Sequence, residues 1–202
     1  NFSGDVGEDM WGLWWTQYAI FTLHTSPYST NLLFYPVGAA GIPVAFFPIA
    51  SLISAPFEII SLAFAYNIIF ILGFVLSGVF MYMLAYYLIR NRYAAFIAGI
   101  IFAFAPQHIA HSFAYLDWVT IEWIPLFVLL FLMMVKERKT KYAIFGAIAF
   151  ILATYMGDTE QGVMLAFFAV VLIIILAIKE LFGGGSFKVL NKRFVFLLAV
   201  LI

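Results

Sequence analysis

Three carboxylate side chains stand close together near the start of the chain, at Asp5, Glu8 and Asp9. Carboxylates at this spacing can bind a divalent cation or supply a general base. The same residues precede a predicted helix, where acidic side chains also act simply as caps on the positive helix end. The pattern therefore favours either a catalytic or metal-binding cluster or an ordinary helix N-terminus.

A second acidic group is the short turn between two apolar runs that carries Asp158 and Glu160. A hairpin tip needs polar residues, so a solvated loop is the simpler interpretation. An acidic turn beside another acidic segment can also share a cation with it, Mg²⁺ or Mn²⁺ among the candidates. We predict that Asp5 and the Asp158/Glu160 turn face one cavity.

Histidines form the third group. His108 and His111 are three residues apart, so on a helix both face the same way, and Asp117 follows shortly after. These side chains can ligate a metal or contact a phosphate, whereas interfacial histidines that merely hydrogen-bond are the commoner case. With His24 they are all the histidines of the chain. We expect His108 or His111 on the rim of the acidic cavity.

The chain that must position these residues is strongly apolar. Hydrophobic residues make up 66% of its 202 residues and charged residues 10%, with a mean hydropathy of +1.09. Soluble domains carry about 25% charged residues, so the bilayer must be the solvent of this chain. The net charge of zero gives no basic surface for nucleic acid, and the absence of cysteine excludes thiol catalysis.

Long apolar runs predict membrane-spanning helices, which need about 20 residues each. A further run begins at Phe194 and stops at Ile202, so we expect an internal piece of a longer protein. The predicted fold is an all-α, polytopic transmembrane helical bundle. Residues 1–58 form a first extracytoplasmic loop, and residues 59–202 hold about five complete spans and the start of another. The complete runs are 59–89, 93–106, 119–135, 142–156 and 161–178.

Threading the runs alternately through a bilayer places all ten basic residues on one side. The excess of Lys and Arg marks that side as cytoplasmic, which predicts a multi-pass protein of the plasma membrane. The basic residues are Arg90, Arg92, Lys136, Arg138, Lys139, Lys141, Lys179, Lys188, Lys192 and Arg193. The outer side collects Asp5, Glu8, Asp9, Glu58, Asp117, Glu122, Asp158 and Glu160.

The first 58 residues do not read as an ordinary loop. Trp11, Trp14, Trp15 and Tyr18 recur at helical spacing, which favours a helix over about residues 8–24 lying along the outer membrane surface, packed on the membrane domain, or both. Prolines then interrupt an apolar stretch at residues 36, 43, 48 and 56, which predicts short, broken helices. Within the spans, small-residue pairs at Gly73/Ser77 and Ala95/Gly99 predict close helix contacts.

An ordered set of segments resembles the N-terminal half of prokaryotic membrane proteins in the C superfamily of glycosyltransferases, which includes oligosaccharyltransferases and protein O-mannosyltransferases. The resemblance covers roughly residues 4 to 125, and it lies in the order of the segments rather than in any single motif. The segments are Gly4-Asp5, Trp11-Gly-Leu-Trp-Trp15, His24-Thr-Ser-Pro27, Leu33-Phe-Tyr-Pro-Val-Gly38, Ala65-Tyr-Asn67, Ser77-Gly78, Met81-Tyr-Met-Leu84, Ala98-Gly99, Phe102-Ala-Phe-Ala-Pro106 and His108/His111.

This resemblance implies transfer of a sugar from a polyprenyl-phosphate-type lipid carrier to an acceptor on the outer side. By the same resemblance Asp5 holds the acidic position that acts as base or positions the acceptor. Asp158 or Glu160 would fill a second acidic position, with Glu8 and Asp9 as further candidates. Some members use a divalent metal. The implied partners are the lipid-linked sugar donor, membrane lipids, and the rest of the chain or a partner subunit.

The chain departs from that expectation because no Lys or Arg is predicted on the outer side, although a lipid phosphate needs positive charge. His24, His108, His111, a metal or the rest of the protein would have to supply it. A non-catalytic membrane subunit of related fold therefore stays open. So does a transporter or flippase, although the acidic residues lie at the ends of spans rather than in their middle.

Overall fold

The computed structural model describes residues 5–40, 48–157 and 159–183, most of them helical. The predicted all-α class is confirmed at this level, apart from one ladder of two short strands. In chain order the elements are α1 (Val6–Gln17), the π-helical turn η1 (Tyr18–Thr22), β1 (Ser29–Thr30), β2 (Ala39–Ala40), α2 (Pro48–Glu58), α3 (Leu62–Ile89), α4 (Arg92–Ala103), α5 (Pro106–Ser112), α6 (Trp123–Glu137), α7 (Thr140–Tyr155) and α8 (Thr159–Gly183).

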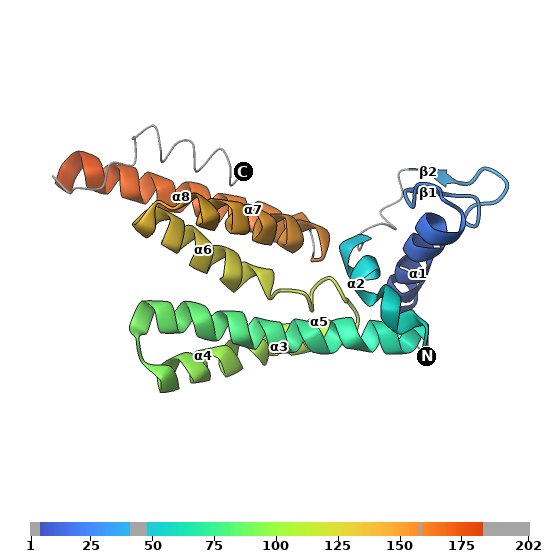
Figure 1. The fold of residues 1–202 in the computed structure, drawn as a ribbon, viewed down its shortest axis with the longest axis horizontal. Coiled ribbons are helices and arrows are strands. Elements are labelled where there is room, and N and C mark those ends of the chain that lie inside the picture. Colours follow the sequence, from blue (N-terminus) through green and yellow to red (C-terminus); the bar gives the residue numbers. More distant parts are fainter. Residues whose placement is uncertain (1–4, 41–47, 158, 184–202) are drawn as a thin grey trace.

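Each of the five complete apolar runs contains a helix, and these helices lie lengthwise beside one another, whereas α1 and α2 gather at one end (Figure 1). The chain reverses sharply between α3 and α4, and again between α6 and α7. Arg90 and Arg138 adopt left-handed backbone conformations there, with φ of 59° and 53°, directly after α3 and α6. The reversals make the neighbouring helices antiparallel.

Helices α3 and α4 form a tight pair. Ser61 Oγ accepts a hydrogen bond from the Phe64 amide at 3.1 Å and begins α3, and the Asn91 side chain accepts from two amides at the start of α4. A Cβ added at Gly99 would lie 2.6 Å from the Gly78 carbonyl oxygen, so the two backbones touch. The close contact predicted at Ala95/Gly99 is confirmed, because only a small residue fits there.

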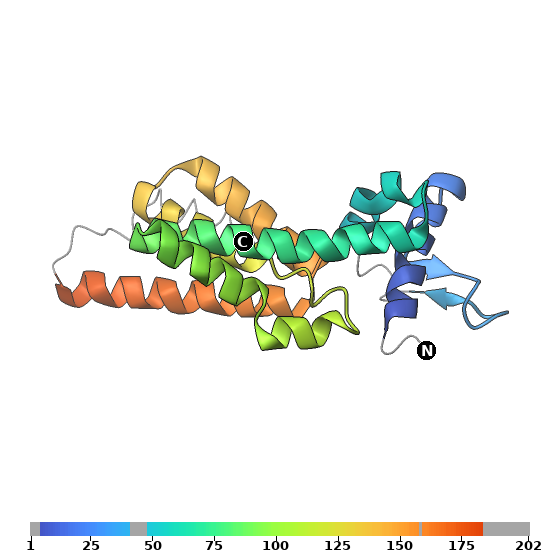
Figure 2. The ribbon, with the colours of Figure 1, turned by 90° about the horizontal axis from the view of Figure 1, so that it is seen from below.

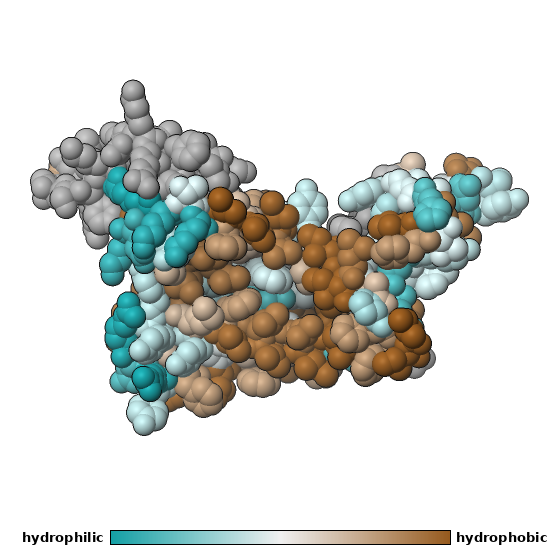
Figure 3. All heavy atoms as spheres, in the orientation of Figure 1, coloured by the Kyte–Doolittle hydropathy of each residue, from teal (hydrophilic) through white to brown (hydrophobic). Residues whose placement is uncertain are grey.

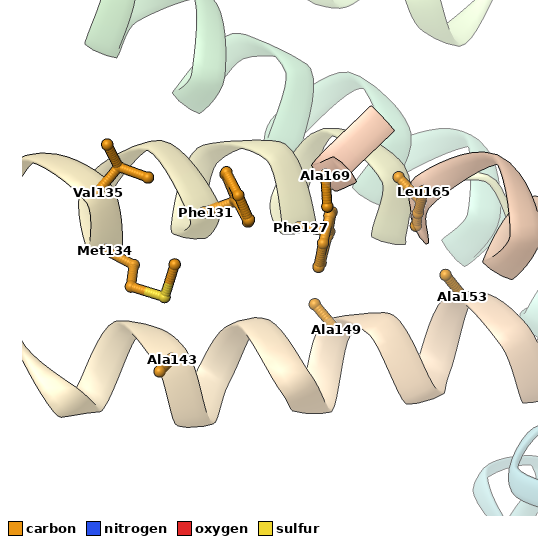
Figure 4. Packing of buried hydrophobic residues seen from close by; sticks show 9 residues of the cluster. All are labelled: Phe127, Phe131, Met134, Val135, Ala143, Ala149, Ala153, Leu165 and Ala169. Carbon is orange, nitrogen blue, oxygen red and sulfur yellow. The ribbon is translucent and has the colours of Figure 1, made fainter. Parts of the chain in front are cut away.

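Helices α6, α7 and α8 share one core in which large side chains meet small ones. Figure 4 shows the rings of Phe127 and Phe131 on α6 beside the opposing helices, with Ala149 below Phe127. The small residues let the backbones approach while the rings fill the space between them. The cluster comprises Phe127, Phe131, Met134, Val135, Ala143, Ala149, Ala153, Leu165 and Ala169.

Three helical stretches of the described chain are long and apolar enough to cross a membrane: Leu62–Ile89, Arg92–Ser112 and Thr159–Ile178. With 28 residues, α3 is about 42 Å long, against about 30 Å of hydrocarbon. Helices α6 and α7 have 15 and 16 residues, shorter than a full span. Apolar side chains face outward along the middle of the molecule, where they form a broad belt (Figure 3).

The region before α3 is built partly as predicted. Helices α1 and η1 run continuously from Val6 to Thr22, which confirms a helix over about residues 8–24. The prediction of short helices from residue 36 onward is wrong for residues 36–40, because these residues lie in a turn and in β2. Left-handed backbone at Phe34 and Gly38 turns the chain back, so that Ala39 and Ala40 pair with β1. Residues 41–47 are outside the described residues.

Helix α2 joins this region to the long helices. Gln17 is buried, and its amide nitrogen donates to the Ser51 carbonyl at 3.0 Å and to Glu58 Oε1 at 2.6 Å. These bonds fix α1 against α2, which in turn packs on α3. Both ribbon views show α1 running across the direction of α3 rather than along it (Figures 1 and 2).

Candidate functional site

The basic residues of the described chain lie at one end of the long helices, and most of the acidic residues lie at the other, Glu137 being an exception. The turns that carry residues 90–92 and 136–141 are neighbours at one end, where hydrophilic side chains gather (Figures 1 and 3). Arg90 and Lys136 both lie over the ring of Tyr87, at 5.5 and 5.6 Å from its centre. Helix α1 and the segment of residues 113–122, called here the 113–122 loop, lie at the other end.

The start of α1 contacts the 113–122 loop directly. The Asp5 amide donates to the Ala114 carbonyl at 3.1 Å. One turn later, Asp9 Oδ2 accepts a hydrogen bond from the Leu116 amide at 3.0 Å. Two segments more than 100 residues apart in the sequence therefore meet at the acidic residues of α1.

Asp9 is the buried member of the acidic group, with 7% of its surface exposed. The pKa of Asp9 is raised to about 7, mainly by burial and in smaller part by the nearby negative charges of Asp117, Asp5 and Glu8. The hydrogen bond from Leu116 opposes them, because it favours the ionised form. Asp9 therefore exchanges its proton near neutral pH, which suits a general acid or base.

Asp5 and Glu8 differ from Asp9 because both are exposed. Asp5 stands at the N-cap position of α1, but its side chain makes no capping hydrogen bond. A hydrogen-bonded cap is therefore absent at Asp5, whereas its charge still lies at the positive end of α1, so both interpretations of this residue stay open. Because its side chain is exposed, Asp5 is accessible from solvent.

The 113–122 loop is held by polar contacts from three further elements. His108 on α5 contacts the Val119 carbonyl through Nε2, at 3.1 Å, and the Ala103 carbonyl through Nδ1, at 2.7 Å. Thr120 Oγ1 lies 2.7 Å from the Met156 carbonyl oxygen, and Gln161 on α8 donates to the Asp117 carbonyl at 3.1 Å. The loop that forms one wall of the acidic site is thus fixed in place.

The three histidines have different surroundings. His108 is 3% exposed, its ring stacks on Phe74 at 4.2 Å, and both its nitrogens face carbonyl groups, which fits the hydrogen-bonding alternative. His111 is partly exposed and stacks on Trp118 at 4.6 Å. His108 and His111 line the same small cavity, of about 230 Å³. His24 is exposed and in left-handed backbone, with φ of 51°.

The structure describes only part of the second acidic turn, the one that carries Asp158 and Glu160. Glu160 is exposed in the first turn of α8. Asp158 lies outside the described residues, so a shared site of Asp5 and Asp158 stays a prediction. Among residues 5–40, 48–157 and 159–183, no group of three or more His, Asp or Glu side chains is placed to hold a metal ion.

Several polar residues that build the site carried no clear signal in the sequence. Gln17 and Gln161 are buried amides that bridge separate elements, yet each stands in the sequence as an ordinary helix residue. Glu122 was expected at the outer end, but its burial before α6, with no hydrogen-bond partner for Oε2 among the described residues, was not. Their position beside acidic or aromatic residues at span ends is the one feature that could have marked them.

The chain was compared with family models, curated proteins and solved structures. No family model, no curated protein and no solved structure matches the chain. Its function has to be argued from its own residues and from the arrangement described above.

Proposed function

We infer that this chain belongs to an integral membrane glycosyltransferase that takes a sugar from a polyprenyl-phosphate-type lipid and passes it to an acceptor outside the cytoplasm. The reaction would take place at the acidic end of the helices, beside α1 and the 113–122 loop. Asp5 is the residue we assign as general base or acceptor-positioning group. The observation that carries the proposal is the meeting of an exposed and a buried carboxylate, Asp5 and Asp9, on that fixed loop.

Embedding in a membrane is supported by three independent features. Three helical stretches have the length and apolarity of spans. Apolar side chains cover the middle of the face shown in Figure 3, and hydrophilic side chains gather at the end of α3 and α4. If α3 crosses the bilayer, α1 lies along its surface, with its aromatic residues at the level of the headgroups.

The orientation follows from the basic turns. Lys and Arg near spans remain on the cytoplasmic side, so the end that carries Arg90, Arg92 and Lys141 faces the cytoplasm. The acidic end then faces outward. Lipid carriers present their sugar and phosphate at the membrane surface, which is where this orientation puts Asp5.

Two carboxylates in unlike surroundings suit acid–base chemistry. Asp9 is buried and its pKa is raised to about 7, whereas Asp5 is exposed. Residues whose surroundings differ in this way can divide the roles of acid and base between them. A protonated Asp9 also removes one negative charge from beside Asp5, which eases the approach of an anionic lipid phosphate.

The described acidic end carries no Lys or Arg. Positive charge for that phosphate therefore has to come from other groups. His111 and His24 are the imidazoles there with exposed surface. The rest of the protein, a partner subunit or a divalent ion bound with Asp158 would supply more. If none of these does so, the chain is a non-catalytic subunit, and the experiment below separates the two cases.

The test uses the full-length gene in its native host. Deleting the gene should remove one glycan from the cell envelope, detected by mass spectrometry, and the unaltered gene should restore it. Asp5→Asn should lower the restored glycan by about 10²–10⁴-fold, the usual contribution of a general base. Glu8→Gln, which neutralises a neighbouring exposed carboxylate, is the matched control and should restore it.

Three outcomes would overturn the assignment. If deletion removes no glycan, the protein is not such a transferase. If Asp5→Asn restores the glycan as well as the unaltered gene does, Asp5 is not the base, and a non-catalytic role is favoured. If Glu8→Gln fails as completely as Asp5→Asn at equal protein levels, the effect is one of general charge and not of Asp5.

A further inference from the structure

Another cavity lies farther along the chain from the 113–122 loop contacts, where the end of α1 and η1 meets the residues around β1. Its volume is about 450 Å³, within the range of about 300–1,000 Å³ usual for small-molecule sites. Its floor is aromatic, with Trp15 and Tyr18, and its wall comes from the residues around β1. Residues 29 to 32 contribute Ser29, Thr30 and Asn31 to that wall.

The aromatic floor is fixed by its neighbours. Trp15 is buried, and its Nε1 donates to the Pro27 carbonyl at 2.9 Å, which ties the loop after η1 to α1. The Tyr18 ring stacks on Trp14, with centres 5.1 Å apart and planes 13° from parallel, and meets Trp15 at 6.3 Å. Tyr18 is half-buried, so its ring and hydroxyl are the part of the floor that a ligand reaches.

The polar wall is held just as firmly. Ser29 and Thr30 pair with Ala40 and Ala39 in the β1–β2 ladder. Asn31 packs against Gly38, where a Cβ would lie 2.6 Å from Asn31 Oδ1, so a larger residue there would displace the amide. The left-handed φ of 75° at Gly38 also favours glycine at this position, because residues with a Cβ rarely adopt it.

The chemistry of the lining is specific. The eight described lining residues carry no charged side chain. They combine aromatic, hydroxyl and amide groups with two aliphatic side chains, Leu23 and Leu32. Within the described part of the chain, the side chains of Tyr18, Ser29 and Asn31 make no hydrogen bond, and neither does Thr25. Hydroxyl and amide groups both donate and accept, so these groups are available to a ligand that does the same.

These features exclude most other ligands. A phosphate or carboxylate would find no cationic partner in the lining. A lipid acyl chain would cover hydroxyl and amide groups without replacing their hydrogen bonds to water, which is costly. A saccharide suits both the aromatic floor and the polar wall of the cavity. Its C–H face can lie on an aromatic ring while its hydroxyl groups form hydrogen bonds with the wall.

We propose that the cavity between Tyr18 and the Ser29–Asn31 segment is a binding site for a neutral saccharide unit. Trp15 lies ten residues after Asp5, which is about 15 Å along α1, so this site is separate from the reacting carboxylate. It would hold a second sugar of an extended acceptor or donor glycan. The inference goes beyond the proposed transfer, since binding here needs no catalysis by Asp5.

The test measures binding by saturation-transfer NMR, with the full chain in lipid nanodiscs and three probes at millimolar concentration. The probes are methyl α-mannopyranoside, methyl β-glucopyranoside and methyl β-N-acetylglucosaminide. We expect saturation transfer to at least one of them. Asn31→Ala should weaken its binding about twofold to tenfold, the effect of one lost hydrogen bond, and Tyr18→Leu should do so at least as strongly.

Two exposed residues outside the lining provide matched controls. Tyr28→Leu removes a neighbouring tyrosine, and Ser26→Ala a neighbouring hydroxyl, and both should bind the sugar as the unaltered chain does. If Tyr18→Leu does not fold, the binding measured for Asn31→Ala decides the test, because residue 31 lies on an exposed loop. Asp5→Asn should retain binding, so that loss of transfer and loss of sugar binding are told apart.

The proposal is overturned if none of the three sugars receives saturation, or if Asn31→Ala binds the preferred sugar unchanged. It is also overturned if the control variants lose binding as fully as the cavity variants do. Transfer of saturation to phosphocholine but to none of the sugars would identify the cavity as a lipid-headgroup site instead.

Discussion

The two ends of the helical bundle differ in how their polar residues are held. At the basic end most of these contacts are local and exposed, such as the Lys139–Glu137 pair at 2.7 Å and Arg90 over the rings of its own helix, and Lys136 over the Tyr87 ring is a longer-range one. At the acidic end they are buried and long-range, as between Asp9 and Leu116 or between His108 and Val119. Water satisfies the first kind, whereas only a folded partner satisfies the second.

This difference indicates what each end is for. An exposed charge that water solvates needs no particular geometry, which is sufficient for setting the orientation of a chain in a membrane. Buried polar groups persist only when the surrounding structure completes their hydrogen bonds, so they fix one arrangement of the segments that supply them. The acidic end is therefore the end where a precise site can be maintained.

The largest expected effect is a complete difference in accessibility between the two ends. The chain has no cysteine, so Glu8→Cys and Lys141→Cys each introduce a single thiol at an exposed position. In intact cells a membrane-impermeant maleimide should label residue 8 fully and residue 141 not at all, because opposite ends of spanning helices face opposite sides. Labelling of residue 141 after the cells are opened is the control.

Labelling of both thiols from the same side of intact cells would contradict this prediction. It would mean that the helices do not cross the bilayer between residues 8 and 141 in the expected way. The proposed site on the outer side would then be wrong as well.

Much of this fold was predictable because hydropathy is a local property. The run 59–89 predicts α3 almost to the residue, since its apolar length and the following Arg90 need no knowledge of neighbours. The run 93–106 was less well delimited. Pro106 begins a new helix, α5, so that the candidate span continues to Ser112.

The site was predictable in its composition but not in its division of roles. Sequence reasoning placed Asp5, Glu8 and Asp9 together, yet it could not tell that Asp9 alone is buried, because its partner Leu116 lies 107 residues away. Likewise, the spacing of His108 and His111 indicates a shared face, but not that His108 is bonded on both sides. The cavity at Tyr18 depends on the β1–β2 pairing, which no pattern in two-residue strands could indicate.

The next largest effect contrasts one residue from each end. His108→Ala leaves the carbonyls of Ala103 and Val119 without their ring partner in a buried place, and each unmet group costs about 1–3 kcal/mol. We therefore expect the free energy of unfolding, measured by denaturant titration in mixed micelles, to fall by about 2–5 kcal/mol. Lys139→Ala breaks only an exposed pair and should leave the unfolding midpoint unchanged.

A conservative variant sharpens the contrast between the ends. His108→Gln keeps one amide that can donate to either carbonyl, so its loss of stability should be intermediate. If His108→Ala is as stable as the unaltered chain while Lys139→Ala is not, the contrast drawn between the two ends is reversed.

The smallest effect is a pH dependence that belongs to Asp9. Burial raises the pKa of Asp9 to about 7 from an ordinary value of 3.8, so between these values the folded chain holds a proton that the unfolded chain has lost. Stability from this residue is therefore full below about pH 4, falls as the pH rises toward 7, and is constant above it. At about 1.4 kcal/mol for each pKa unit, and with water screening part of the interaction, the loss is on the order of 1–3 kcal/mol.

Asp9→Asn isolates this contribution, because an amide cannot ionise and its oxygen can still accept from the Leu116 amide. In unfolding titrations at about pH 4 and pH 8, the variant should match the unaltered chain at the lower pH and exceed it in stability at the higher one. Glu8→Gln removes an exposed carboxylate one residue earlier, the smallest of the contributions that raise the pKa of Asp9, and should retain the fall in stability with only a small change in its size. An Asp9→Asn chain less stable at pH 8 than the unaltered one would show instead that the ionised carboxylate holds α1 to the 113–122 loop. The acidic end would then be maintained by the charge of Asp9, and its proton would have no part in the proposed chemistry.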